Sequence, residues 1–366
     1  MLRHNENARP LRVRIIGEHL LHNINVLRQY AKTAGIIAMV KADAYGHGAL
    51  AVAETLAPHV DYLGVASFDE GLQLKIAGCQ TPIVLNEGFF KIAEVPAIIA
   101  HGFSIVIHDV HQLAALESLN LQMPIAVWFK IDVGMGRLGF SPELFLKLLP
   151  RIQQASWLKI LGVWGHLPCA DDLNMTETTA QCAIFEQCTQ GLTVPKSLAN
   201  SAALLRFPEA HYDFVRPGIM LYGISPFAHQ SGETLGLKPV MVFESELIAI
   251  KEIPPGSTVG YGATWTAPMG EKTRIGIVAA GYADGYPRTV PSGTPVLIAG
   301  ERVPLVGRVS MDMMAVLLPA HLSVQVGETV TLWGPGLPVE EVAQAAGTIP
   351  YELCCHRAQR VPVTVC

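Results

Sequence analysis

Residues 125–165, IAVWFKIDVGMGRLGFSPELFLKLLPRIQQASWLKILGVWG, contain the pattern that decides the fold. Apolar runs at 125–131 and 160–165 each predict a buried strand. Between them, residues 142–153 carry apolar side chains at helical spacing, and Ser141 followed by Pro142 is typical of a helix N-terminus. The stretch therefore predicts one strand–helix–strand unit with parallel strands.

The same alternation extends along the first 232 residues, where amphipathic segments such as 18–30 and 69–77 separate short apolar runs. Further strands are predicted at 36–40, 62–66, 82–85, 104–107, 197–199 and 214–215. Nearly all-apolar strands joined by helices indicate a parallel sheet that helices cover. About eight such units in about 220 residues favour a TIM-like (β/α)8 barrel over an open sheet. The run at 11–16 alternates apolar and basic residues, so we expect it to pack outside the barrel wall.

From residue 233 onward the helical period fades. Apolar segments separated by Gly and Pro predict strands at 240–251, 274–279, 295–298, 303–309, 313–318 and 329–333. One helix is expected at 340–346, and residues 229–237 are expected to form a linker. The sequence thus predicts an α/β protein with a barrel at 1–232 and a β-rich C-terminal domain at 233–366.

Composition excludes several classes of protein. Charged residues make up 16% of the 366 residues and apolar residues 50%, whereas an ordinary soluble protein has about 25% charged residues. No apolar stretch reaches the roughly 20 residues of a membrane-spanning helix, and no signal-peptide pattern is visible. The net charge of −5 disfavours nucleic-acid binding. We therefore expect a soluble, oligomeric protein with no membrane or nucleic-acid partner.

The cysteines and histidines favour neither disulfides nor a metal site. The seven cysteines include the adjacent pair Cys354 and Cys355 and show no paired CxxC spacing, which is typical of reduced thiols in a cytoplasmic protein. The segments 108–111 (HDVH) and 354–356 (CCH) lack the four ligands of a structural metal site. We expect a cytoplasmic protein without a bound metal.

Polar side chains end or follow five of the predicted barrel strands. In barrel enzymes the C-terminal ends of the strands carry the active site, so these positions are candidates for function. The candidates are Lys41, Lys130 with nearby Arg137, His166, Asn200 with Ser201, and Arg216.

Lys41 stands at the mouth of an apolar strand, where desolvation would lower its pKa and free the amine to form a Schiff base. A lysine that extends from the barrel rim into solvent fits the spacing equally well. Lys130 and Arg137 place two cations in one region with few carboxylate partners, among which Asp132 is a candidate, and a solvated pair is the alternative. The glycines at 134, 136 and 139 match GxGxxG but lack the strand position and the downstream acid of a dinucleotide site, so we interpret them as loop glycines.

Arg216, Gly218 and Ile219 follow the last predicted barrel strand, where many barrels bind phosphate through backbone N–H groups. Tyr45, Asn200 and Ser201 could add further donors, although a simple glycine turn explains the segment as well. In the second domain, the glycine-rich segments 259–265, 281–288 and 307–314 carry an unusual number of tyrosines on expected turns.

Taken together, these residues resemble alanine racemases over about residues 11–364. The motifs KADAYGHG, KIDVGMGRLG, ANSAAL, VRPGIMLYG, VGYGATW and GRVSMDM occur in the family's order, followed by TIPYEL. The resemblance implies a pyridoxal 5'-phosphate (PLP) enzyme that interconverts L- and D-alanine, for peptidoglycan synthesis or D-alanine catabolism. It also implies a head-to-tail homodimer in which the β domain of one subunit completes the barrel site of the other.

The resemblance assigns roles to single residues. Lys41 matches the lysine that binds PLP covalently and acts on the D-face, and Tyr261 matches the opposing base, which the partner subunit supplies for the L-face. Arg216 matches the residue that donates to the pyridine nitrogen, and since arginine keeps its proton, that nitrogen stays unprotonated and transamination is disfavoured. His166 matches the middle of a tyrosine–histidine–arginine chain.

Other matches concern the cofactor's oxygens and the substrate. Arg137 matches a contact to the cofactor's phenolic oxygen and the substrate carboxylate, and Lys130 matches a lysine that is carbamylated in many members. The Met311 N–H matches a contact to the substrate carboxylate, and Asp312 lies beside it. The phosphate-binding positions match Tyr45, Ser201, Gly218, Ile219 and Tyr351. The sequence departs from the family at Leu167 and Pro168, where we expect their side chains to alter the surroundings of the cofactor.

Three alternative functions remain. A racemase of broader or serine specificity would share most motifs, although its periplasmic relatives carry a signal peptide. A barrel-type PLP decarboxylase would place Glu rather than Arg216 against the pyridine nitrogen. A non-enzymatic PLP-binding protein of single-barrel type would lack the second domain and with it Tyr261.

Overall fold

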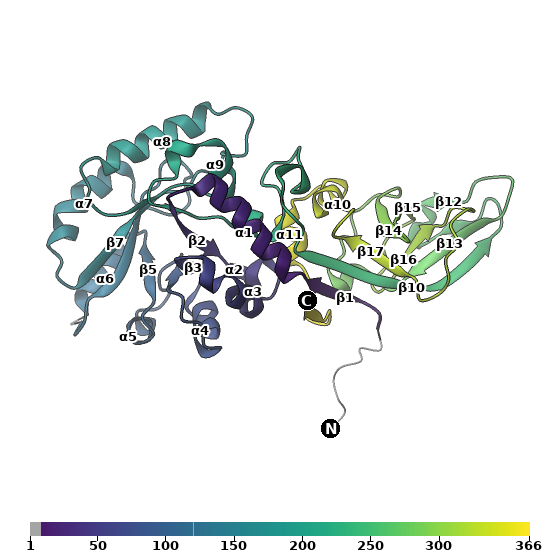
Figure 1. The fold of residues 1–366 in the computed structure, drawn as a ribbon, viewed down its shortest axis with the longest axis horizontal. Helices are drawn as coiled ribbons and strands as arrows, with labels where there is room; N and C mark the ends of the chain where they lie inside the picture. Colours follow the sequence, from purple (N-terminus) through teal and green to yellow (C-terminus); the bar gives the residue numbers. More distant parts are fainter. Residues whose placement is uncertain (1–8, 120) are drawn as a thin grey trace, which may run out of the picture. The chain divides into compact units, whose positions relative to one another are not determined.

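The computed structural model describes residues 9–119 and 121–366. Residues 21–221 and 226–229 form one compact unit, and the described residues up to 20 form a second unit together with 222–225 and 230–366. Figure 1 shows the course of the chain through both units. Within the described part of the chain, no helix is long and apolar enough to cross a membrane.

The first unit contains a closed barrel of eight parallel strands, which confirms the predicted (β/α)8 architecture. The last strand pairs with the first, Ile36 lying opposite Val215, and this pairing closes the ring. The strands are β2 (Gly35–Met39), β3 (Tyr62–Val65), β4 (Ile83–Leu85), β5 (Ser104–Ile107), β6 (Ile125–Lys130), β7 (Leu158–Trp164), β8 (Lys196–Ser197) and β9 (Phe214–Val215).

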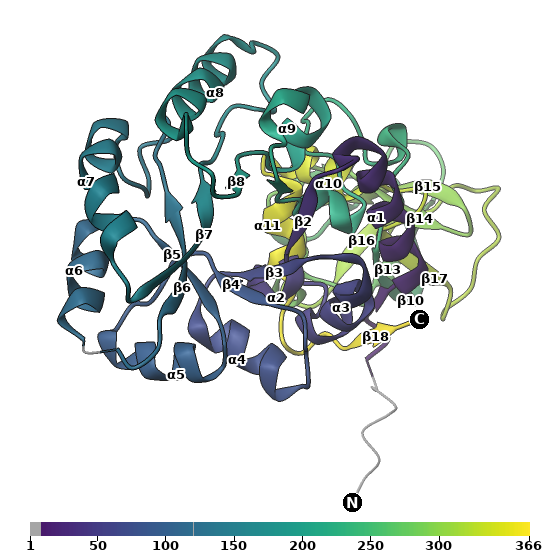
Figure 2. The same cartoon turned by 60° about the vertical axis from the view of Figure 1, so that its left-hand side comes forward.

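Helices connect these strands, and Figure 2 shows α4 to α8 around the outside of the barrel strands. They are α1 (Gly17–Ala31), α2 (Lys41–Tyr45), α3 (Ala49–Leu56), α4 (Phe68–Ile76), α5 (Val95–Ala100), α6 (Val110–Ser118), α7 (Pro142–Gln154), α8 (Thr176–Thr189) and α9 (Ser201–Arg206). The start of α7 is as predicted, because Ser141 Oγ accepts a hydrogen bond from the Leu144 N–H at 3.2 Å and Pro142 occupies the first turn.

Large side chains fill the inside of the barrel. The indole rings of Trp128 and Trp164 stack with centroids 5.8 Å apart, within a cluster that also contains Ile37, Met39, Val84 and Val106. Gly162 makes room for this packing, since a Cβ there would lie 2.4 Å from the Trp128 ring. The barrel is therefore a packed core, and the functional positions are confined to its ends.

The second unit is mainly β, as expected. Its sheet has the order β13-β16-β15-β14-β17-β10-β1-β18, and β13 also pairs with β10. The strands are β1 (Arg12–Ile15), β10 (Met241–Ile253), β13 (Thr273–Val278), β14 (Pro295–Ile298), β15 (Glu301–Val306), β16 (Met314–Leu317), β17 (Thr329–Trp333) and β18 (Val363–Val365). A separate hairpin joins β11 (Thr258–Val259) to β12 (Trp265–Thr266), and two helices, α10 (Val339–Ala346) and α11 (Pro350–Cys355), follow the main strands.

The first strand, β1, lies in this sheet and not in the barrel wall. It pairs antiparallel with β10 and parallel with β18, so both ends of the described chain lie next to each other. Val13 and Ile15 are buried, whereas Arg12 and Arg14 both donate to the buried carboxylate of Glu244, at 2.6 and 2.9 Å. This arrangement explains the alternation of apolar and basic residues in the segment.

Candidate functional site

The C-terminal ends of the barrel strands bring the predicted cations together. Lys130 is the last residue of β6, Arg216 follows β9 directly, and Lys41 lies two positions after β2. Because all eight strands are parallel, these side chains share one end of the barrel. The positive charges of Lys41, Arg137 and Arg216 all act on Lys130 and on His166, which shows that the five groups form one electrostatic cluster.

Lys41 begins a left-handed turn that the sequence reasoning did not predict. Residues 42–45, which contain no glycine, all have φ of 53° or 54°. Such a conformation costs roughly 1–2 kcal/mol per residue and persists only where neighbouring groups hold it. Here the Ala42 N–H donates to Glu70 Oε1 at 2.8 Å, and Asp43 Oδ1 accepts from the Ala49 N–H at 2.7 Å. The turn places Lys41 and Tyr45 at its two ends, beside the barrel mouth.

Arg216 is buried and held by oxygen atoms of the barrel strands. One terminal nitrogen donates to Ser197 Oγ at 2.6 Å and the other to the carbonyl oxygens of Gly165 and Leu198. The guanidinium also lies over the Trp164 ring, 4.8 Å from its centroid. Burial lowers the pKa of Arg216 to about 9, so the group stays protonated at neutral pH and acts only as a donor.

Burial and the neighbouring positive charges of Arg216, Arg137 and Lys41 lower the pKa of Lys130 to about 8. The same causes hold the pKa of His166 well below its ordinary value, so its imidazole is neutral at neutral pH. Asp132 does not compensate these charges by an ion pair. Its Oδ1 accepts the backbone N–H groups of residues 134, 135 and 136, and no ion pair of Lys130 or Arg137 is found among residues 9–119 and 121–366.

The glycines of the GxGxxG match shape the loop between β6 and α7, as interpreted from the sequence. Gly134, Gly136 and Gly139 have φ of 131°, 68° and 129°. A Cβ on Gly139 would lie 2.6 Å from the Asp132 backbone nitrogen, so no larger residue fits there. The loop presents Arg137, which is exposed in a single chain.

A cluster of small and polar groups lies beside the cations, at the start of α9 and after β9. The Gly218 N–H donates to Ser201 Oγ at 2.9 Å, and a Cβ on Gly218 would lie 2.4 Å from Tyr45 Oη. Ile219, fully buried, begins the 3-10 helix η4 (Ile219–Tyr222). These residues bring a backbone N–H and two hydroxyl groups to one place, which is the type of donor set that binds phosphate.

Asn200 connects this cluster to the loop after β7. Its Oδ1 accepts from the Ala203 N–H at 3.0 Å and caps α9, while its Nδ2 donates to the Leu167 carbonyl at 2.9 Å. The Leu167 side chain is buried. Both ends of the Asn200 amide are thus engaged within the protein, so this residue braces two loops of the site.

The remaining predicted site residues lie in the second unit. Tyr261 is 69% exposed and begins the 3-10 helix η6 (Tyr261–Ala263), in a turn where Gly260, Gly262 and Ala263 have positive φ. Met311 is 52% exposed, and Asp312 and Tyr351 are half-buried. The candidate residues of the barrel therefore lie in the first unit, and these four residues lie in the second unit.

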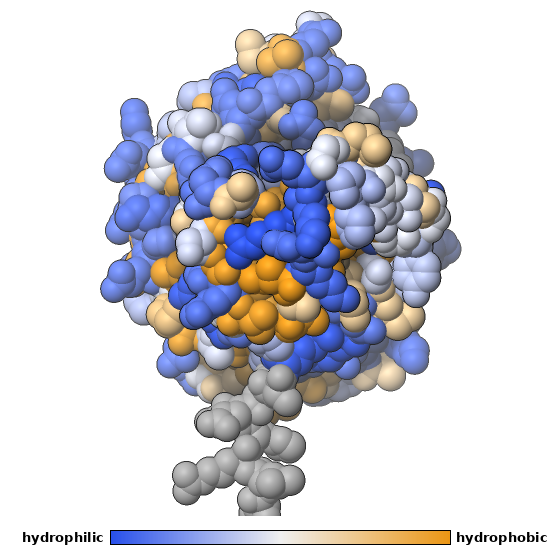
Figure 3. Space-filling view, turned by 90° about the vertical axis from the view of Figure 1, so that its right-hand side faces the viewer, coloured by the Kyte–Doolittle hydropathy of each residue, from blue (hydrophilic) through white to orange (hydrophobic). Residues whose placement is uncertain are grey.

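The three glycine-rich segments of the second domain come together in space. A Cβ on Gly307 would lie 2.6 Å from the Val259 carbonyl oxygen, and a Cβ on Gly281 would lie 2.3 Å from that of Met311. Nearby, Val259, Ile275, Val306 and Ala315 form an apolar cluster. Figure 3 shows apolar side chains in the middle of the face on the β12–β13 side of this unit, bordered by hydrophilic ones.

Models of two protein domains match nearly the whole chain. The alanine racemase N-terminal domain matches residues 15–226, and the alanine racemase C-terminal domain matches residues 240–365. The chain belongs to the alanine racemase family. Alanine racemases are isomerases that act on amino acids.

Individual alanine racemases are similar over their full length. The alanine racemase of Shewanella amazonensis is 45% identical over 358 residues, which cover 96% of this chain and 98% of that protein. The alanine racemase of Vibrio cholerae is 44% identical over 348 residues, which cover 95% and 96% of the two chains. The crystal structure of the biosynthetic alanine racemase from Pseudomonas aeruginosa superposes with a TM-score of 0.94 at 42% identity and covers 98% of this chain and 99% of its own.

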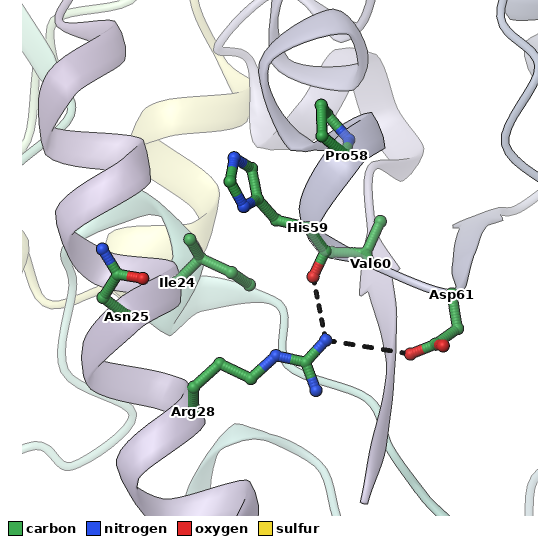
Figure 4. A pocket seen from close by; sticks show the side chains of 7 residues that line it. All are labelled: Ile24, Asn25, Arg28, Pro58, His59, Val60 and Asp61. Atoms are coloured by element: carbon green, nitrogen blue, oxygen red, sulfur yellow. Dashed lines mark hydrogen bonds and ion pairs between the residues drawn. The ribbon is translucent and has the colours of Figure 1, made fainter.

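A separate pocket of about 340 Å³ lies away from the cluster of cations at the barrel mouth (Figure 4). Asp61, which lines it, precedes β3 and accepts from the Ile36 N–H at 2.7 Å, so the pocket lies at the N-terminal end of the strands. Arg28 Nη2 donates to the His59 carbonyl oxygen at 2.9 Å and lies 3.9 Å from Asp61 Oδ2. Residues at this end of a barrel serve stability more often than catalysis.

Proposed function

We propose that the protein interconverts L-alanine and D-alanine with PLP as its cofactor. The observation that carries this proposal is the position of Lys41, at the start of a held left-handed turn and inside a cluster of cations at the barrel mouth. Family membership and 44–45% identity to alanine racemases over nearly the whole chain support the choice of substrate.

The donor set of the barrel fits PLP. Lys41 supplies an amine for the aldehyde, and Tyr45, Ser201, Gly218 and Ile219 supply hydroxyl and backbone donors for the phosphate, to which we add Tyr351. The excess of positive charge around Lys130 and Arg137 also requires an anion. When bound, PLP withdraws electron density from the α-carbon of an attached amino acid and so acidifies its C–H bond.

Arg216 controls the strength of this effect. Its guanidinium stays charged and can only donate, so it would hydrogen-bond the ring nitrogen without giving it a proton. Because Arg216 would supply no proton, it would keep this electron withdrawal weak and so disfavour side reactions such as transamination. His166 would link Arg216 to the catalytic tyrosine as a neutral imidazole, and Asn200 would fix the loops around it.

Inversion at one carbon requires a base on each face. We assign Lys41 to the D-face and the partner subunit's Tyr261 to the L-face, each taking the α-proton in one direction and returning it in the other. Tyr261 of a single chain is 69% exposed, and a second copy would remove it from water. The protein would therefore act as a head-to-tail homodimer with shared sites.

The substrate carboxylate needs donors of its own. We assign this role to Arg137 and to the backbone N–H of Met311, with Asp312 next to it. Within residues 9–119 and 121–366, no acceptor takes a hydrogen bond from the Met311 N–H, so it is available to a carboxylate oxygen. Arg137 is likewise exposed on its loop.

We further propose that Lys130 is carbamylated. The neutral amine attacks the carbon of CO2, an N–C bond forms while one C=O π bond breaks and its electrons move to oxygen, and the nitrogen releases one proton to water. The product is an anion that can bind Arg137, whose charge Asp132 does not compensate by an ion pair in the described part of the chain.

The functional division of the chain follows from these roles. We propose that residues 1–232 bind the cofactor and that residues 233–366 supply Tyr261 to the other subunit. None of the seven cysteines, all of which lie within the described residues, forms a disulfide, and this supports a reducing cytoplasmic location. Family membership supports a role in peptidoglycan synthesis or D-alanine catabolism.

The decisive experiment is incubation with L-alanine and PLP in deuterated water. D-alanine carrying α-deuterium is expected, and its absence would refute the proposal. A panel of amino acids measures specificity, and a preference for serine over alanine would replace the proposed substrate.

A further inference from the structure

The segment 281–285, GYADG, packs against the backbone of the loop at 310–313. The N–H groups of Tyr282 and Ala283 donate to the carbonyl oxygens of Ser310 and Met311, each at 3.0 Å. A Cβ on Gly281 would lie 2.3–2.4 Å from three backbone atoms of Ser310 and Met311. The two segments are therefore in direct backbone contact, and only glycine fits at position 281.

The carboxylate of Asp284 is the centre of this contact. Its side chain is fully buried, and Oδ2 accepts both the Gly281 N–H and an Arg9 N–H at 2.8 Å. Its Oδ1 accepts from Arg360 Nε at 2.7 Å. Two arginines from opposite ends of the chain thus meet at one buried carboxylate.

The same two arginines also hold the 310–313 loop. Arg9 donates to the Asp312 carbonyl at 2.6 Å, and Arg360 donates to Asp312 Oδ1 at 2.6 Å. The side chains of Met311 and Met313 are 52% and 45% exposed, so they add little packing to the backbone hydrogen bonds that hold this loop. Asp284 therefore reaches Asp312 through two separate charged bridges.

The end of the chain closes over the segment 281–285 from the other side. The Ala358 N–H donates to the Asp284 carbonyl at 3.2 Å, and a Cβ on Gly285 would lie 2.5 Å from the His356 carbonyl oxygen. Gly285 has φ of 104°, which a larger residue rarely adopts. The backbone that leads to Arg360 is therefore held against the segment 281–285.

We propose that Asp284, acting through Arg9 and Arg360, is a positioning group that fixes the Met311 N–H for the substrate carboxylate. This inference rests on the proposed role of Met311 and extends it to three residues that do not contact substrate. A carboxylate that is buried with two arginines is a rigid support, because removing one partner leaves a buried charge without its hydrogen bonds.

The proposal predicts a specific kinetic effect. The Met311 N–H would bind the carboxylate equally in the ground state and in the transition state, so its misplacement raises KM and leaves kcat nearly unchanged. We expect Arg360→Met to raise KM for both L- and D-alanine by roughly 3–10-fold, with kcat within about 2-fold of the unaltered enzyme. Because the overall equilibrium constant is unchanged, both directions shift together.

The test compares Arg360→Met with Arg302→Met in the PLP-loaded enzyme. Arg302 is a matched control, since it is similarly exposed and binds Glu341 in the same unit. Amide hydrogen exchange over residues 307–314, measured on the cofactor-free protein, gives a readout that does not depend on activity. We expect faster exchange there and a raised KM in Arg360→Met. In Arg302→Met, the exchange rate and KM should both be unchanged.

Asp284→Asn provides a second variant, and it should show the same exchange and KM changes to a larger extent. Unchanged exchange and unchanged KM in Arg360→Met would overturn the proposal, as would an equal effect of Arg302→Met. If the unaltered enzyme shows no racemisation, the proposed function fails. The exchange measurement still decides in that case whether Asp284 and the two arginines hold the loop.

Discussion

The pKa of Lys130 leads to a sharp prediction about carbon dioxide. Burial and three neighbouring positive charges lower this pKa from 10.5 to about 8. At pH 7 about one Lys130 side chain in ten is then a neutral amine, against about one in three thousand for an ordinary lysine. The fraction that can attack CO2 is therefore roughly 300-fold larger.

The assay is ¹³C NMR of the protein in ¹³C-bicarbonate, with the dissolved CO2 concentration held constant while pH is varied. We expect a carbamate carbonyl resonance that grows as pH rises through about 8 and is absent in Lys130→Arg. Lys272→Arg, which removes an exposed lysine paired with Glu252, should keep the resonance. A resonance that persists in Lys130→Arg, or that appears only near pH 10, would refute the reasoning.

The same shift has a consequence for stability. A lysine whose pKa is lowered on folding binds fewer protons when folded, so its contribution to stability rises with pH between about 8 and 10.5. Below pH 8 the charged Lys130 side chain lowers the free energy of unfolding by about 3 kcal/mol. In CO2-free buffer at pH 7, Lys130→Met should therefore raise the free energy of unfolding by up to about 3 kcal/mol in denaturant titrations. The gain should shrink when bicarbonate is added, and a gain that bicarbonate leaves unchanged would contradict a carbamate at Lys130.

Three further predictions concern the two bases and the strained turn. Tyr261→Phe should slow α-proton abstraction from L-alanine by about 100-fold or more, and abstraction from D-alanine far less, because it removes one general base. Equal losses for both enantiomers in deuterium-exchange assays would reject the assignment of faces. Co-expressed Lys41→Ala and Tyr261→Phe chains should recover about a quarter of the activity of the unaltered enzyme. About half of the dimers are then hybrids, and one of the two sites in each hybrid is intact. No recovery would argue against shared sites. Ala42→Gly should stabilise the protein by about 0.5–1 kcal/mol because it relieves the strain of a positive φ. Its control, Ala180→Gly on the exposed face of α8, should destabilise the protein by about the same amount. Melting temperatures that shift in the same direction for both variants would contradict the strain argument.

Local patterns in the sequence were sufficient to predict most of the fold. The runs at 104–107 and 214–215 coincide with β5 and β9, and the Ser141–Pro142 start of α7 is as expected. These features are predictable because apolar periodicity and helix capping act over a few residues. The cations at the strand ends are also predictable, because parallel strands place all their C-terminal ends on one side of a barrel.

Other features depend on contacts between distant segments, so only the tertiary structure decided them. The pairing of β1 with β10 and β18 joins the two ends of the described chain, and β18 has no strong signal of its own. The left-handed turn after Lys41 contains no glycine and exists because Glu70 and the backbone around it hold it.

Asp284 is the clearest example of a feature that contacts between distant segments decide. In the sequence it is one acid within a glycine-rich turn, and nothing nearby marks it as buried. In the structure, Arg9 and Arg360 approach it from 275 and 76 positions away along the chain and satisfy its charge. Residue types and local spacing determined the barrel, the β domain and the candidate cations. Which charge meets which partner was decided by the tertiary structure, because that choice depends on distances that only the folded chain defines.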